Sequence, residues 1–161
     1  LVTFYSSIIC KNVDWIGPKA LETIAIGCLL HDIGLINLPP SIRESGGKNL
    51  SPADLARYND HPRIGAEMLQ NFPSINEQVR QIIYQHHECV NGLGYPNGLT
   101  GLKIYPLAKI VALADTFTDI LIDKKLPPKE SLRSFLNDRE GMMKHDPTLI
   151  RALVYGMSRK G

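Results

Sequence analysis

The residues best suited to chemistry are histidines and aspartates that interrupt apolar helical patterns. His31 lies three positions after Cys28 and seven after Ile24, and Asp32 lies four positions after Cys28. In a helix, this spacing places both polar side chains on the apolar face. A carboxylate buried on that face without a partner is strongly destabilising. The pattern therefore predicts that a cation compensates Asp32.

Two later segments repeat this arrangement. His86 and His87 close an apolar helical pattern, with His87 four positions after Ile83, and Asp115 lies four positions after Val111. Helical bundles build metal sites from imidazoles and carboxylates that several helices direct into one core. Taken singly, each of these residues is more often a hydrogen-bonded core histidine or a capping carboxylate. Their joint occurrence on matching faces favours a metal site.

Other residues of the same chemical types are less clearly placed by spacing. His61 stands at an expected helix start, and His145 is interpreted as a helix-flanking residue outside the set. Cys89 lies beside the histidine pair, where a small turn residue is favoured over a metal ligand. The apolar surroundings of Cys10 and Cys28 predict buried free thiols in a reducing, cytoplasmic compartment.

The elements that position these residues are predicted to be helices. Apolar residues recur at helical spacing, and no segment has the alternation of a strand. We predict an all-α orthogonal helical bundle of about seven helices, in which a long glycine-rich loop follows His87. Ser74 and Glu77 fit a capping box for the helix that ends near His87. Expected helices cover residues 2–17, 18–34 and 61–72. Others begin after the expected N-caps Ser51 and Asp146, at Pro106 and after Pro127.

Length and composition predict one domain, covering residues 1–161. Of the 161 residues, 43% are hydrophobic and 21% are charged, which suits a single full core. The net charge of +2 is too small to predict binding of a nucleic-acid polymer. His31 and Asp32 interrupt the longest apolar run, which predicts no membrane insertion. Since the chain begins without Met or a signal-peptide pattern, we expect it to be the C-terminal part of a longer protein.

Five motifs together resemble the HD-GYP domain of the HD phosphohydrolase superfamily. They are HD at 31–32, HPRIG at 61–65, HHE at 86–88, GLGYP at 92–96 and AD at 114–115. The resemblance implies hydrolysis of cyclic di-GMP to a linear dinucleotide or GMP in bacterial signalling. It also implies two or three divalent metal ions, iron or manganese, a cyclic dinucleotide as substrate, and GGDEF-type signalling proteins as candidate partners.

The same resemblance assigns roles to residues. Asp32 is expected to be catalytic by bridging two metals. His31 and Asp115 are expected to bind one of them, and His61, His86 and His87 the other. The loop is expected to lie over the substrate, with the substrate-binding residues Asn91, Gly92, Gly94, Tyr95 and Pro96.

The sequence departs from the family pattern around the substrate. Leu35 replaces the usual lysine, and Asn91 replaces the usual aspartate. The usual Arg-Pro-Tyr segment is absent, and Lys124 or Lys125 is the nearest substitute, without the bidentate fork of arginine. One more histidine ligand of the family is expected just before Leu1. These changes affect phosphate recognition and leave the six ligands intact.

Three hypotheses follow for the function. The first, which the intact ligands favour, is a metal-dependent phosphodiesterase of low activity on cyclic di-GMP. The second is a divergent module that binds metal, and nucleotide or a partner protein, without efficient hydrolysis. The third is a phosphohydrolase that acts on another nucleotide or phosphate ester.

Overall fold

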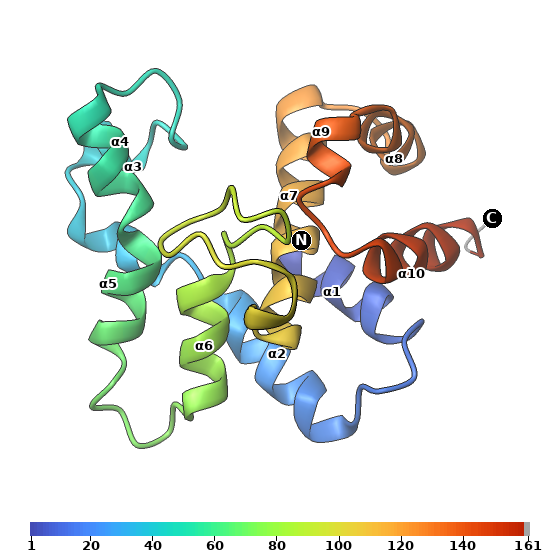
Figure 1. Cartoon of the computed structure of the whole chain (residues 1–161), viewed down its shortest axis with the longest axis horizontal. Helices are drawn as coiled ribbons and strands as arrows, with labels where there is room; N and C mark the ends of the chain where they lie inside the picture. The colour runs from blue at the N-terminus through green and yellow to red at the C-terminus, as the bar shows by residue number, and fades with distance from the viewer. Residues whose placement is uncertain (160–161) are drawn as a thin grey trace.

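The computed structural model describes residues 1–159, and this part of the chain is helical, with no strand (Figure 1). The prediction of an all-α bundle is therefore confirmed. The α-helices are α1 Val2–Cys10, α2 Pro18–Leu30, α3 Pro40–Arg43, α4 Pro52–Asn59, α5 His61–Met68, α6 Glu77–Gln85, α7 Pro106–Lys124, α8 Pro128–Asn137, α9 Arg139–Met142 and α10 Pro147–Ser158. Two 3-10 segments are η1 Ile33–Asn37 and η2 Gly101–Lys103.

Helix α7 is the centre of the core. It packs against α1, α2, α6, α8 and α10. Leu113 and Phe117 of α7 are fully buried, and the Phe117 ring meets Tyr5 of α1 edge to face, with 4.8 Å between ring centroids. Burial of each large apolar side chain contributes about 1.5–3 kcal/mol. This core fixes the helix that carries Asp115.

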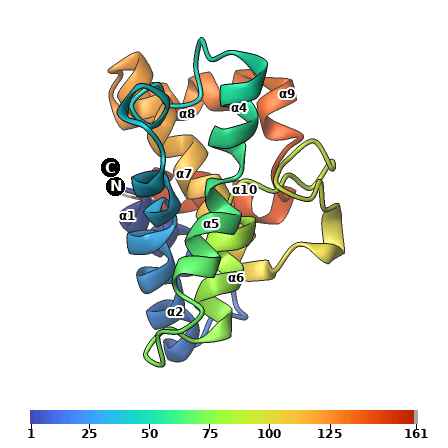
Figure 2. The same cartoon turned by 90° about the vertical axis from the view of Figure 1, so that its left-hand side faces the viewer.

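Helices α2, α5 and α6 form a second group beside α7 and run close together in Figure 2. The segment η1 packs directly on α5. A Cβ atom on Gly34 would overlap the backbone carbonyl of His61, so a glycine is needed at this contact. The close approach places the turn that contains Asp32 next to His61.

Several predicted helix boundaries are wrong. Helix α1 ends at Cys10 rather than near residue 17, and α5 ends at Met68 rather than Phe72. Helix α2 ends at Leu30, because the chain tightens into η1, so His31 and Asp32 lie just after the helix rather than on its face.

The predicted capping box at Ser74 is also wrong. Asn76 is the N-cap of α6, and its side chain accepts a hydrogen bond from Val79 N at 2.9 Å. By contrast, Ser51 and Asp146 do cap α4 and α10 by accepting from backbone N–H groups. The short helices α3 and α9 were not predicted, because four residues carry no periodicity.

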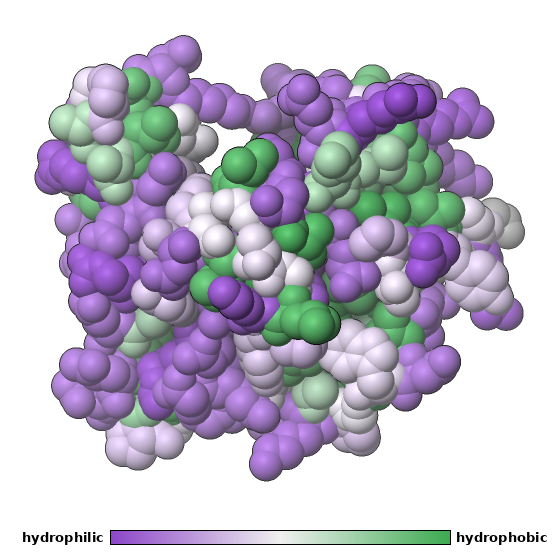
Figure 3. All heavy atoms as spheres, viewed as in Figure 1, coloured by the Kyte–Doolittle hydropathy of each residue, from purple (hydrophilic) through white to green (hydrophobic). Residues whose placement is uncertain are grey.

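By length and composition alone, one stretch of the described residues, Pro18–Asn37, is apolar enough to cross a membrane. Core helices of soluble proteins pass the same test. Ile24 and Cys28 of this stretch lie in the hydrophobic core. The absence of membrane insertion stays a prediction. In the space-filling view, hydrophilic residues dominate the side of the molecule formed by α5 (Figure 3).

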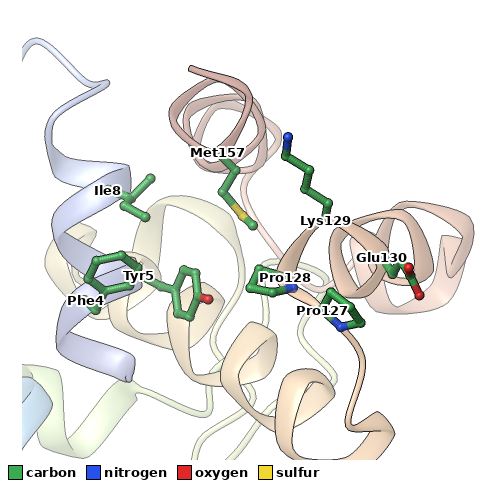
Figure 4. Close-up of a pocket in the computed structure, with 8 residues that line it drawn as sticks. All are labelled: Phe4, Tyr5, Ile8, Pro127, Pro128, Lys129, Glu130 and Met157. Carbon is green, nitrogen blue, oxygen red and sulfur yellow. The ribbon is translucent and has the colours of Figure 1, made fainter. Parts of the chain in front are cut away.

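A cavity of about 530 Å³ lies between α1, α10 and the start of α8 (Figure 4). In Figure 4, Tyr5 points from α1 toward Pro128, and Met157 of α10 lies above them. The lining is mainly apolar and contains no histidine. None of the residues predicted to bind metal or substrate lines this cavity.

Candidate metal centre

The structure brings the six predicted ligands together from four segments. His31 and Asp32 follow α2, and His61 begins α5. The pair His86 and His87 follows the last residue of α6, and Asp115 lies within α7. The ring centroids of His31 and His86 are 5.1 Å apart, although 55 positions separate the two residues in sequence.

Three of the histidines are anchored in the same way. The Nδ1 atoms of His31, His61 and His86 lie 2.7–2.8 Å from backbone carbonyl oxygens three residues earlier in the chain. Since a carbonyl only accepts, each Nδ1 carries the proton and donates it. In the neutral form of each imidazole, Nε2 then has a lone pair that points away from this carbonyl. Such outer hydrogen bonds orient metal-binding histidines and fix their tautomer.

The Nε2 atoms converge on the carboxylate of Asp32. Its Oδ1 lies 3.2 Å from His61 Nε2 and 3.6 Å from His86 Nε2, whereas its Oδ2 lies 3.4 Å from His31 Nε2. With Nδ1 protonated, these contacts place acceptor against acceptor, which is unfavourable without a shared proton or cation. A cation between the carboxylate and the imidazoles removes this conflict. The donor set therefore fits metal ions.

Two half-sites share Asp32. One potential ligand atom from each of Asp32, His61, His86 and His87 lies within 4.8 Å of the others. On the other side of the carboxylate, His31 Nε2 also lies 3.5 Å from Asp115 Oδ1. Asp32 thus presents one oxygen to each half-site, as a bridging carboxylate would.

The pKa values report strong coupling between these groups. Burial alone would lower the pKa of His31, but hydrogen bonding to Asp115 and the charges of Asp32 and Asp115 raise it to about 9. Burial would raise the pKa of Asp32, but His61 and His86 hold it well below its usual range. Burial and the neighbouring histidines lower the pKa of His87. Several carboxylate and imidazole acceptors thus compete for few protons, and a bound cation would satisfy them.

Carboxylates gather at this centre without a lysine or arginine partner among the described residues. In the described part of the chain, no Lys or Arg nitrogen lies within 4.0 Å of the Asp32 or Asp115 carboxylates. One turn beyond Asp115, burial and the charge of Asp115 raise the pKa of Asp119 to about 6. The excess of carboxylates again favours metal binding.

The glycine-rich loop is fastened to the centre. Tyr95 N donates to His87 O at 3.1 Å, and the Tyr95 ring lies on the His87 ring with 4.6 Å between centroids. A Cβ atom on Gly94 would overlap the backbone of His87 and Cys89, so the loop packs closely there. Asn91 accepts from Leu93 N at 3.1 Å within the loop.

Glu88 is a functional residue that spacing alone did not identify. Its side chain is buried, and its two carboxylate oxygens accept from Asn97 N and Leu99 N, both at 2.7 Å. These bonds hold the far end of the loop against the histidine pair. The signal that the sequence offers is a glutamate directly after two histidines.

Three other residues with assigned or open roles can now be placed. Lys124 donates to Ser134 Oγ of α8 at 2.5 Å rather than to the centre. Cys89 has no atom in the described cluster of ligand groups, in agreement with a turn residue. His145 flanks α10 as predicted, but its side chain is buried.

The sequence profile of the HD domain family matches residues 2–149. The chain belongs to the HD domain family. The chain also matches the solved structure of Bd1817, an HDG"Y"P protein from Bdellovibrio bacteriovorus. This match confirms the HD-GYP resemblance. That match has a TM-score of 0.80 and 29% identity, and it covers 99% of this chain and 50% of that one.

Two bacterial relatives are also similar to this HD-GYP chain. It is 34% identical to the cyclic di-GMP phosphodiesterase response regulator RpfG of Xanthomonas campestris, covering 89% of this chain and 39% of the relative. It is 32% identical to the cyclic di-GMP phosphodiesterase PA4108 of Pseudomonas aeruginosa, covering 91% of this chain and 35% of the relative. The chain thus spans well under half the length of these relatives.

Proposed function

We propose that this HD-GYP chain is a metal-dependent phosphodiesterase domain that hydrolyses cyclic di-GMP to a linear dinucleotide or GMP. The observation that carries the proposal is the Asp32 carboxylate, which presents one oxygen to His61 and His86 and the other to His31. The names of the relatives support cyclic di-GMP as the substrate.

Two divalent ions, iron or manganese, suit the mixed imidazole and carboxylate donors. Asp32 would bridge them; His31 and Asp115 would hold one ion, and His61, His86 and His87 the other. A third ion is the alternative that the family resemblance allows. When bound, such ions polarise a phosphoryl oxygen and lower the pKa of water.

Residues of the chain orient the metal ligands and cover the substrate. The Nδ1 anchors fix each imidazole, and burial of His61 and His86 excludes water from their rings. The loop covers the substrate with the residues Asn91, Gly92, Gly94, Tyr95 and Pro96. The position of Tyr95 on His87 supports this assignment.

A second function is favoured by the phosphate-binding residues. Leu35 offers no charge, and Lys124 is engaged with Ser134. Loss of one donor to a developing charge costs about 10²–10³-fold in rate. A module that binds metal and nucleotide with little turnover is therefore the alternative. The 3'3'-cGAMP-specific phosphodiesterase 2 of Vibrio cholerae, 38% identical over 89 residues, supports hydrolysis of another nucleotide as the third candidate function.

The wider setting is part of the proposal. We infer that residues 1–161 form one domain of a longer cytoplasmic signalling protein. GGDEF-type proteins remain candidate partners, and neither a nucleic-acid polymer nor a membrane is expected to bind.

The test is metal analysis and turnover of the full-length protein. Purified protein is analysed for iron and manganese and incubated with cyclic di-GMP or 3'3'-cGAMP, beside Asp32→Ala. The exposed Asp14→Ala is the matched control. We expect metal and product in the wild type and the control, and loss of both in Asp32→Ala. Bound metal without any product would refute the phosphodiesterase and support the binding module.

A further inference from the structure

His145 carries an unsatisfied buried nitrogen. Its side chain is 6% exposed, and within the described residues its Nε2 is the one buried side-chain nitrogen or oxygen without a hydrogen-bond partner. Native proteins pair nearly all such groups, since leaving one unpaired is destabilising. The nitrogen therefore points to a ligand that supplies the missing partner.

The nitrogen belongs to a residue that lines a separate pocket of about 180 Å³. The pocket lies where the turn before α10 meets α7 and the glycine-rich loop. It shares His86, His87 and Tyr95 with the candidate metal centre but includes none of His31, Asp32, His61 and Asp115. Backbone contact between Val90 N and Lys144 O, at 2.8 Å, holds the turn against the loop.

Most polar groups of the lining can donate a hydrogen bond. Lys144, His145, Thr116 and Tyr95 all line the pocket, and none of their side-chain polar atoms has a hydrogen-bond partner in the described part of the chain. The one carboxylate of the lining, Glu88, already accepts two backbone N–H bonds. Unengaged donors around a small cavity favour an anion.

Electrostatics agree with an anion. The Lys144 ammonium lies close enough to Cys89 to oppose the increase in thiol pKa that burial causes. Burial, followed by the charge of Lys144, lowers the pKa of His145 to about 4. At neutral pH the imidazole is uncharged, and the tautomer with its proton on Nε2 can donate to an oxyanion.

We propose that Lys144 and His145 form an anion subsite that holds a phosphate group beside the candidate metal centre. The phosphate is either a phosphoryl group of the nucleotide substrate or inorganic phosphate. The first source rests on the proposed function, whereas binding of inorganic phosphate does not depend on it. The subsite supplies a cation near the loop that neither Leu35 nor Lys124 provides.

The experiment titrates inorganic phosphate into the full-length protein by calorimetry, with a chelator present so that metal does not contribute. The variants are His145→Phe, His145→Gln and Lys144→Gln. Lys103→Gln is the control, because Lys103 is likewise exposed and makes no ion pair among the described residues. Circular dichroism of each variant verifies folding.

We expect saturable binding to the wild type and the control. Affinity should fall about tenfold in His145→Phe and Lys144→Gln, and His145→Gln should restore part of it because its amide can donate. No binding to the wild type, or equal binding to all folded variants, would overturn the subsite.

A second measurement separates the two sources of phosphate. With metal present, Lys144→Gln should raise KM for cyclic di-GMP about tenfold with little change in kcat if the subsite holds the substrate. An unchanged KM together with weaker phosphate binding assigns the subsite to inorganic phosphate. Failure of the protein to hydrolyse the dinucleotide would refute the proposed function and leave the chelated titration intact.

Discussion

At the scale of the residue, the orientation of each histidine ring depends on the hydrogen bond made by Nδ1. The Nδ1 atoms of His31, His61 and His86 each donate to a backbone carbonyl three residues earlier. This repeated local contact directs three Nε2 atoms at Asp32. Each of these contacts is local in sequence, because the carbonyl lies three residues before its histidine. Helical periodicity, however, does not predict the orientation of the ring.

Glu88→Gln should loosen the loop. One of the two acceptor oxygens becomes an NH2 donor, so one of the bonds from Asn97 N and Leu99 N is lost and the other loses its charged acceptor. We expect a loss of about 1–3 kcal/mol in the free energy of unfolding. Faster hydrogen exchange at the amides of residues 97 and 99 would locate the effect, with Glu22→Gln, an exposed glutamate of α2, as the control. Unchanged exchange at both amides would contradict the anchoring role.

His145 should make the protein sensitive to mild acid. The pKa of its side chain is about 4 in the folded protein and about 6.5 when unfolded. As pH falls between these values, the unfolded state takes up a proton that the folded state does not, so stability falls. In urea titrations with chelator and without phosphate, the wild type should lose up to about 3 kcal/mol more than His145→Phe from pH 7 to pH 4. Parallel pH profiles for the two proteins would contradict the assignment.

At the scale of the element, the site depends on how closely helices approach. Helices α5 and η1 touch at Gly34, where a side chain would meet the backbone of His61. Because Asp32 lies two residues before Gly34, this contact sets the distance between Asp32 and His61. The motif HD is therefore positioned by a glycine that carries no chemistry.

Gly34→Ala should move Asp32 away from His61. The added Cβ forces η1 away from α5, and overpacking of this kind costs about 1–3 kcal/mol. We expect lower thermal stability and weaker Mn²⁺ binding, measured by calorimetry. Gly17→Ala is the control, because its Cβ would meet nothing within 4 Å. Wild-type affinity for Mn²⁺ in Gly34→Ala would show that the contact does not set the site.

At the scale of the whole molecule, the candidate metal centre includes residues from both groups of helices, the one around α7 and the one formed by α2, α5 and α6. The candidate ligands come from α5, from α7 and from the turns after α2 and α6, so metal bound there would connect both helix groups. A ligand that binds only the folded state stabilises it by mass action. The metal should therefore act as a cross-link for the whole fold.

Removal of metal should lower the melting temperature of the full-length protein. At a free Mn²⁺ concentration 100 times Kd, the expected stabilisation is about 2.7 kcal/mol. Differential scanning calorimetry with chelator and with added Mn²⁺ measures the difference. Asp32→Asn should lose the response, whereas Asp14→Asn should keep it. An equal response in Asp32→Asn would place the stabilising ion elsewhere.

The sequence by itself determined the helical class, the caps at Ser51 and Asp146, and the grouping of His31, Asp32, His86, His87 and Asp115. These features depend on local periodicity and capping chemistry, which neighbouring residues determine, whereas His61 joined the group only through the family resemblance. The family resemblance added the pairing of the ligands into two half-sites.

Only the tertiary structure decided how Asp32 divides its two oxygens, that Lys124 turns to Ser134, and that His145 lies buried beside the loop. Each of these depends on contacts between segments far apart in the chain. His145 is the clearest example. Its sequence position indicates only a residue that flanks a helix, whereas the packing of α7 and the loop near it buries its Nε2 without a hydrogen-bond partner among the described residues.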